Sequence, residues 1–196
     1  LRYSHFPAER IRLIYQSCGD YFATPSDAAT RQAVREKYSL PQRYLLNVGT
    51  VEARKNLLLA VQALCHLPEE LRLVVVGRHT VYATRVKKYI AAHHLQNRVL
   101  FLHDIPNHEL PAIYQQAEVF LYPSFYEGFG IPIIEAIQSG LPVVAATGSC
   151  LEEAGGSASL YVSPEDAEGM AVAIQRLLIG SPEREPAIAA SREYIR

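Results

Sequence analysis

Two neighbouring cations follow the first strongly apolar run of the chain. Gly49 ends that run, and Arg54 and Lys55 stand where the next helix is expected to begin. The first turn of a helix carries unpaired N–H groups and partial positive charge, so two cations there are unfavourable unless an anion compensates them. A phosphate group would do so. Residues 49–56 therefore predict a phosphate-binding loop, and a solvated loop with scattered charges is the alternative.

Two carboxylates follow a later apolar run. Glu127 precedes a loop with Gly128 and Gly130, and Glu135 comes after seven intervening residues. Glycines let a ligand approach the backbone closely, and carboxylates accept hydrogen bonds from sugar hydroxyls. Cations in one loop and carboxylates in another suit a ligand that is phosphate in the middle and polyol at its ends. The alternative is that both glutamates are acids favoured at a helix start.

Other motifs are weaker. The loop 146–156 carries small residues, and its Ser149 suits phosphate contact, although a plain turn with a helix cap is equally compatible. Ile133 stands where a dinucleotide fingerprint would need a third glycine. The seven histidines show no metal-ligand spacing, and the three separated cysteines predict free thiols. We therefore expect no metal site and no disulfide framework.

The loops with this chemistry lie between apolar, β-branched runs that begin 20 to 27 residues apart. Such runs are typical of strands that are buried on both faces. The expected strands are 44–48, 71–76, 98–102, 118–122 and 142–145. The expected helices between and after them are 56–66, 81–94, 110–117, 133–139 and 166–178. This alternation predicts an α/β fold, a parallel sheet with helices on both faces and its ligands at the carboxyl ends of the strands.

The ends of the chain are less regular. Ile11–Tyr15 is expected to be a short strand, and 26–38 a helix with Ser26 as its N-cap. Pro182 and Pro186 are expected to break the chain before a last helical stretch ending at Arg196.

Composition sets the class of protein. The 196 residues are 49% hydrophobic and 20% charged, which is typical of a globular domain. A net charge of −1 argues against nucleic-acid binding, and no apolar run reaches the roughly 18 residues of a membrane span.

Taken together, the loops resemble the retaining glycosyltransferases of family four (group 1). The spacing of Glu127 and Glu135 around the glycine loop is similar to the signature of that family, and 49–56 and 140–145 are similar to two more of its motifs. The resemblance extends from about residue 11 to residue 178. It implies a Rossmann-like fold, namely the C-terminal, donor-binding half of the two-domain GT-B architecture.

The same resemblance implies how the chain is divided. Residues 1–40 would be the interdomain connection with a leading strand and helix, and 41–180 the nucleotide-sugar-binding domain. Residues 181–196 would begin a truncated C-terminal helix, starting near Ser191. The acceptor-binding N-terminal half would be missing, so we expect this chain alone to be inactive. A cytoplasmic location is expected, with membrane association only through the absent half.

The reaction implied is the retaining transfer of a hexose from a nucleotide diphosphate sugar to an acceptor, without an obligatory metal or other cofactor. By resemblance, Arg54 and Lys55 would hold the diphosphate, Glu127 would contact the transferred sugar, and Glu135 would bind the ribose. Thr50 and Glu152 depart from the usual pattern, which puts more weight on the two cations. The full set of expected donor-binding residues is Gly49, Thr50, Gly77, Arg78, Gly128, Phe129, Gly130, Glu135 and Ser149.

Three functions remain open at this point. The Arg-Lys-Asn sequence at 54–56 favours a mannosyltransferase that uses GDP-mannose. A sugar-nucleotide 2-epimerase would share the phosphate and ribose chemistry. A non-catalytic domain that binds nucleotide sugars would need only the binding residues.

Overall fold

A computed structural model describes residues 7–12 and 14–195 of the chain. Residues 1–6, 13 and 196 lie outside the described residues, and with them part of the expected strand 11–15 and the expected helix end at Arg196. The described residues of 11–15 form no strand, so that prediction fails for them. In the described residues before the first α-helix, the helical elements are two short 3-10 helices, η1 (Ala8–Arg10) and η2 (Asp20–Phe22).

Six parallel strands form one sheet in the order β3-β2-β1-β4-β5-β6. They are β1 (Tyr44–Val48), β2 (Arg72–Val76), β3 (Val99–Leu102), β4 (Val119–Tyr122), β5 (Val143–Ala146) and β6 (Leu160–Val162). The predicted α/β class and all five predicted strands are confirmed. Strand β6 is not among the predicted strands, because it has only three residues and is half-buried at the edge of the sheet.

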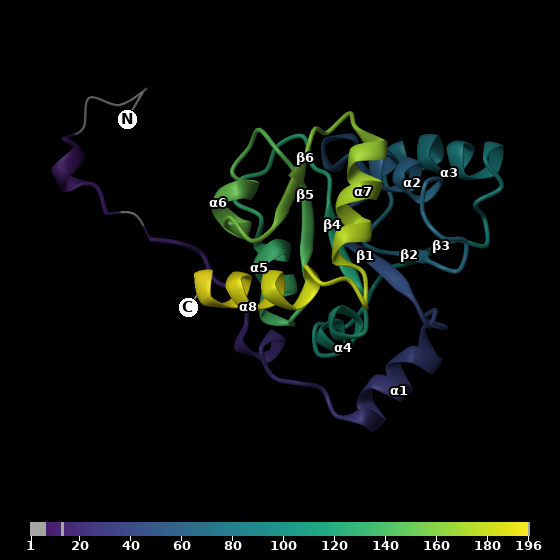
Figure 1. The fold of residues 1–196 in the computed structure, drawn as a ribbon, viewed down its shortest axis with the longest axis horizontal. Helices are drawn as coiled ribbons and strands as arrows, with labels where there is room; N and C mark the ends of the chain where they lie inside the picture. Colours follow the sequence, from purple (N-terminus) through teal and green to yellow (C-terminus); the bar gives the residue numbers. More distant parts are fainter. Residues whose placement is uncertain (1–6, 13, 196) are drawn as a thin grey trace.

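Helices cover both faces of the sheet, as Figure 1 shows. One layer contains α2 (Leu57–Leu64), α3 (Tyr82–Ala92) and α7 (Ala167–Leu177). The other contains α1 (Ala28–Lys37), α4 (Leu110–Gln115), α5 (Ile131–Gln138) and α6 (Leu151–Gly155). Leu45 packs into the first layer and Leu46 into the second, because successive side chains of a strand point to opposite faces. Burial on both faces explains the unbroken apolar runs.

Several boundaries differ from the prediction. Asp27, not Ser26, caps α1, because its carboxylate accepts a hydrogen bond from the backbone N–H of Thr30. The last helix, α8 (Arg184–Tyr194), begins well before Ser191. Pro186 lies in its first turn, where a missing N–H breaks no helical hydrogen bond. No helix among the described residues is both long and apolar enough to cross a membrane.

The sheet order brings two loops together at one point. β1 and β4 are neighbours in the sheet, but α2 after β1 and α5 after β4 pack on opposite faces. The chain therefore leaves the carboxyl ends of these two strands in opposite directions. Doubly wound sheets open a crevice for ligands at such a switch point. The loop after β1, which carries Arg54 and Lys55 (the cation loop), and the loop after β4, which carries Glu127, both start there.

We predict that Gly77→Ala destabilises the fold. A Cβ at this position would lie 2.0 Å from the backbone oxygen of Gly49, so the turns after β1 and β2 would have to move apart. Overpacking of this kind costs about 1–3 kcal/mol of unfolding free energy. Urea unfolding of parent and variant measures it. Gly128→Ala is the control: a Cβ there meets no atom within 4 Å, so an equal loss in both variants would contradict the steric explanation.

Candidate functional site

The loop after β1 is fixed to the loop after β4 by backbone and amide contacts. The 3-10 helix η3 (Ala53–Lys55) ends at Asn56, whose φ of 52° lies in the left-handed region that asparagine tolerates. The Asn56 side-chain amide donates to the carbonyls of Pro123, at 3.2 Å, and Pro164, at 2.8 Å. The backbone N–H of Phe125 donates to the Arg54 carbonyl at 2.9 Å. These contacts set the position of Arg54 and Lys55.

Glu127 lies between the two cations. Its Oε2 accepts from Arg54 Nη1 at 2.5 Å, and its Oε1 accepts from Lys55 Nζ at 3.0 Å and from Ser124 Oγ at 2.9 Å. The predicted catalytic residues Arg54, Lys55 and Glu127 are thus brought into direct contact. Within the protein, the anion that compensates the cations is this carboxylate. The sequence pattern predicts instead that the cations and the glutamate belong to two separate ligand-binding loops.

The charges of this cluster support each other. Burial raises the pKa of Glu127, but the hydrogen bonds from Arg54 and Lys55 outweigh it and bring the pKa below its ordinary value. The hydrogen bond to Glu127 in turn raises the pKa of Arg54. Arg54 Nη2 also donates to Glu52 at 2.7 Å, and its guanidinium lies 5.5 Å from the centre of the Tyr126 ring. Arg54 and Glu127 are therefore both ionised near neutral pH.

A cavity of about 650 Å³ opens beside this cluster. Lys55, Tyr122 and Glu127 form one side of it, and the loop Gly128–Gly130 with Phe129 forms another. A third side comes from the N-terminal segment around Tyr15. Four predicted site residues besides Glu127 thus share one cavity, which brings together a cation, a carboxylate and a glycine-containing loop.

Other predicted residues lie at the same edge of the sheet but do not line this cavity. Gly77 packs against the Gly49 carbonyl, and the Arg78 carbonyl accepts from the N–H of Val51 next to Thr50. The Ser149 hydroxyl is buried and makes no hydrogen bond to any of the described residues.

Glu135 also lies apart from the cavity. Its Oε2 accepts from the Tyr114 hydroxyl at 2.8 Å, and Glu135 does not line the cavity. Burial raises the pKa of Glu135, and the hydrogen bond from Tyr114 offsets only part of this effect. The two glutamates of the predicted pair therefore have opposite electrostatic environments, one among cations and one in a largely apolar setting.

The structure adds residues that the sequence analysis did not single out. Tyr122 ends β4, and its hydroxyl accepts from Lys55 Nζ at 2.9 Å. Ser124 donates to Glu127, and Glu52 accepts from Arg54. The Cys150 thiol lies 3.1 Å from the Glu127 carbonyl. Tyr122 could have been found, since a tyrosine at the carboxyl end of a buried strand places its hydroxyl near the ligand edge. The other three are common loop residues with no distinguishing pattern.

Solved structures share this fold. Sucrose-phosphate synthase from Thermosynechococcus elongatus is 28% identical with a TM-score of 0.81, over 94% of this chain and 47% of that one. Anabaena HepE, solved in complex with UDP and glucose, is 20% identical with a TM-score of 0.77, over 97% of this chain and 57% of that one. The fold thus defines a Rossmann-like domain of the kind found in GT-B glycosyltransferases.

The sequence identifies the family. The profile described as glycosyl transferases group 1 matches residues 30–194, and the chain belongs to this glycosyltransferase family. O-antigen chain mannosyltransferase B of Escherichia coli is 35% identical over 195 residues, which are 96% of this chain and 51% of that protein. The chain thus spans about half the length of this relative.

We predict that Glu127→Gln and Glu135→Gln change the pH dependence of stability in opposite directions. The pKa of Glu127 is lowered, so its stabilising contribution is present above its unfolded value, about 4.3, and is lost as the pH falls through the lower folded value. Glu127→Gln should therefore cost about 1–3 kcal/mol near neutral pH and progressively less in acid.

The pKa of Glu135 is raised, so its contribution is complete below the unfolded value and is lost as the pH rises through the folded value. Relative to the parent, Glu135→Gln should become more stable as the pH rises. Urea unfolding from about pH 3.5 to pH 7 measures both profiles. Parallel profiles for the two variants would contradict the assigned environments.

Proposed function

We propose that this chain is the donor-binding half of a retaining hexosyltransferase, and that it binds a nucleotide diphosphate sugar at the switch point between β1 and β4. The observation that carries the proposal is the contact of Arg54 and Lys55 with Glu127 beside a cavity of about 650 Å³. Family membership supports glycosyl transfer as the reaction class. The acceptor-binding half would come from the rest of a longer protein, as in relatives about twice as long.

The diphosphate would bind to the two cations. Lys55 uses two of its three N–H donors, on Tyr122 and Glu127, which leaves one for a phosphate oxygen. Arg54 is a planar fork suited to phosphate, and it can exchange one carboxylate contact for a phosphate contact. Their charge would stabilise the diphosphate as it leaves the sugar, an effect typically worth about 3–4 kcal/mol at the barrier. On this account no metal is required.

The sugar would lie beside Glu127 and the glycine loop. An ionised carboxylate only accepts hydrogen bonds, so the free lone pairs of Glu127 suit the hydroxyls of the transferred hexose. The backbone of Gly128–Gly130 lines the same cavity and would add contacts. Glu135 would accept from the ribose hydroxyls with the carboxylate oxygen that Tyr114 leaves free.

GDP-mannose is the donor we propose. The mannosyltransferase name of the 35% identical relative and the Arg-Lys-Asn sequence at 54–56 support it. The UDP in the HepE structure supports diphosphate binding by this fold, although not this choice of base. We also propose a cytoplasmic location, because sugar nucleotides are made there.

We predict that Lys55→Ala weakens the binding of GDP by about 1.5–3 kcal/mol, the scale of one hydrogen bond between charged groups. Calorimetric titration with GDP, UDP and ADP, with and without magnesium, measures this and identifies the base. Lys88→Ala is the matched control, because Lys88 is exposed on α3 and its side chain makes no hydrogen bond or ion pair with the described residues. Equal affinity of Lys55→Ala and parent would remove Lys55 from the site.

We further predict that Glu135→Ala weakens the binding of guanosine as well as GDP, because contacts to ribose do not depend on phosphate. The expected loss is about 1–2 kcal/mol for each ligand. Lys55→Ala should leave guanosine binding unchanged in the same titration. If Glu135→Ala weakened GDP but not guanosine, the ribose role would be wrong.

A further inference from the structure

The extended segment 14–17 lies against the candidate site by means of one side chain. Among the described residues, no hydrogen bond between backbone groups anchors residues 14–17. The Tyr15 hydroxyl instead donates to Glu153 Oε1 at 2.8 Å, and its ring stacks on Phe129 with 5.8 Å between ring centres. Tyr15 therefore fastens the segment to two separate parts of the site edge, the glycine loop and α6.

The loop Gly128–Gly130 needs contacts that fix its conformation. Gly128 has no neighbour within 4 Å of where a side chain would be, and Gly130 has a φ of 110° in the region that favours glycine. Phe129, between them, has its ring against Tyr15 and its carbonyl 3.4 Å from the Cys150 thiol. A loop with glycines on both sides of one residue has many accessible conformations. Fixing one of them when a ligand binds costs conformational entropy.

Tyr15 also forms a wall of the cavity. With its neighbours Ile14 and Gln16 it lines the space that Lys55 and Glu127 line from the body of the domain. It makes no contact with Arg54 or Lys55 among the hydrogen bonds and ring contacts of the described residues. Its direct influence is therefore on the glycine-loop side of the cavity and not on the cation side.

We propose that Tyr15 is a positioning residue for the sugar part of the donor, which holds the loop Gly128–Gly130 in its binding conformation through Phe129 and Glu153. This inference rests on the proposed function, in which the glycine loop contacts the hexose and the cations contact the diphosphate. Tyr15 therefore contributes to the affinity for a nucleotide sugar and not to the affinity for the free diphosphate.

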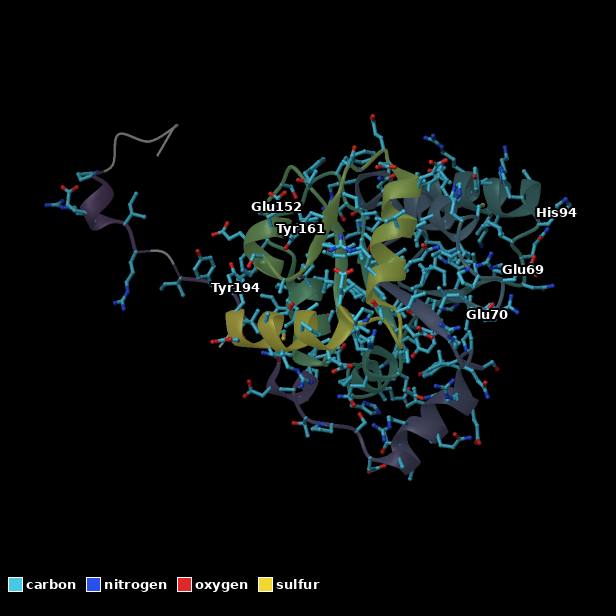
Figure 2. The ribbon with its side chains drawn as sticks, viewed as in Figure 1. Glu69, Glu70, His94, Glu152, Tyr161 and Tyr194 are labelled. Carbon is cyan, nitrogen blue, oxygen red and sulfur yellow. The ribbon has the colours of Figure 1, made fainter. Side chains whose placement is uncertain are left out.

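The test compares GDP-mannose with GDP by calorimetric titration of the parent, Tyr15→Ala, Tyr15→Phe and Tyr194→Phe. Tyr194→Phe is the matched control. Tyr194 lies on α8, and its hydroxyl also donates to Glu153, although to the backbone carbonyl, at 2.8 Å. Figure 2 shows Tyr194 beside the point where the N-terminal segment reaches the body of the molecule. Tyr194 does not line the cavity with Lys55.

Tyr15→Ala should raise the dissociation constant of GDP-mannose about tenfold and leave that of GDP within about twofold, because stacking and hydrogen bond are both lost. Tyr15→Phe keeps the stacking and loses only the hydrogen bond, so it should raise the dissociation constant of GDP-mannose about threefold. Tyr194→Phe should change neither constant.

Two results would overturn the inference: an unchanged GDP-mannose constant in Tyr15→Ala, or an equal rise for GDP and GDP-mannose, which indicates a general loss of structure. Failure of the proposed function is a separate result. It would appear as no binding of GDP by the parent, or as equal GDP binding by the parent and Lys55→Ala, and the inference would fall with it.

Discussion

The contact of Glu127 with Arg54 and Lys55 is the interaction on which the rest of the site depends. Arg54 and Lys55 lie just before the first turn of α2, where two cations repel each other and the partial positive charge of that helix end. The loop after β1 therefore needs a nearby negative charge to keep its shape. The loop after β4 supplies it at 2.5 Å and 3.0 Å. Because β1 and β4 are neighbours in the sheet, these ion pairs connect the two loops at the switch point.

The same arrangement explains how one cluster can serve both folding and binding. A carboxylate among three hydrogen-bond donors compensates the half-buried cations within the protein itself. An incoming diphosphate would add negative charge where one carboxylate already sits between two cations. On the proposed function, the protein would keep its cations oriented for phosphate, so that little reorganisation would be needed on binding.

Much of the fold could be predicted from the sequence, because buried parallel strands are unbroken apolar runs and the helices between them keep their own period. The strand Leu160–Val162 and the short helix Leu151–Gly155 could not, since neither is long enough to show a period. In the site, residue types and spacing predicted the loops. The direction of each side chain could not be predicted, because residue spacing does not show which partner a side chain will contact. Glu127 contacts the cations, whereas Glu135 contacts Tyr114.

Asn56 shows how late in the chain this site becomes complete. Its amide bridges to Pro123 and Pro164, which are 67 and 108 residues further along the sequence. During synthesis β1 and the loop after it emerge well before either partner, and the second acceptor, Pro164, comes only after β6. The loop that carries Arg54 and Lys55 is therefore fixed by contacts that are distant in sequence, which carry the largest cost in loop-closure entropy.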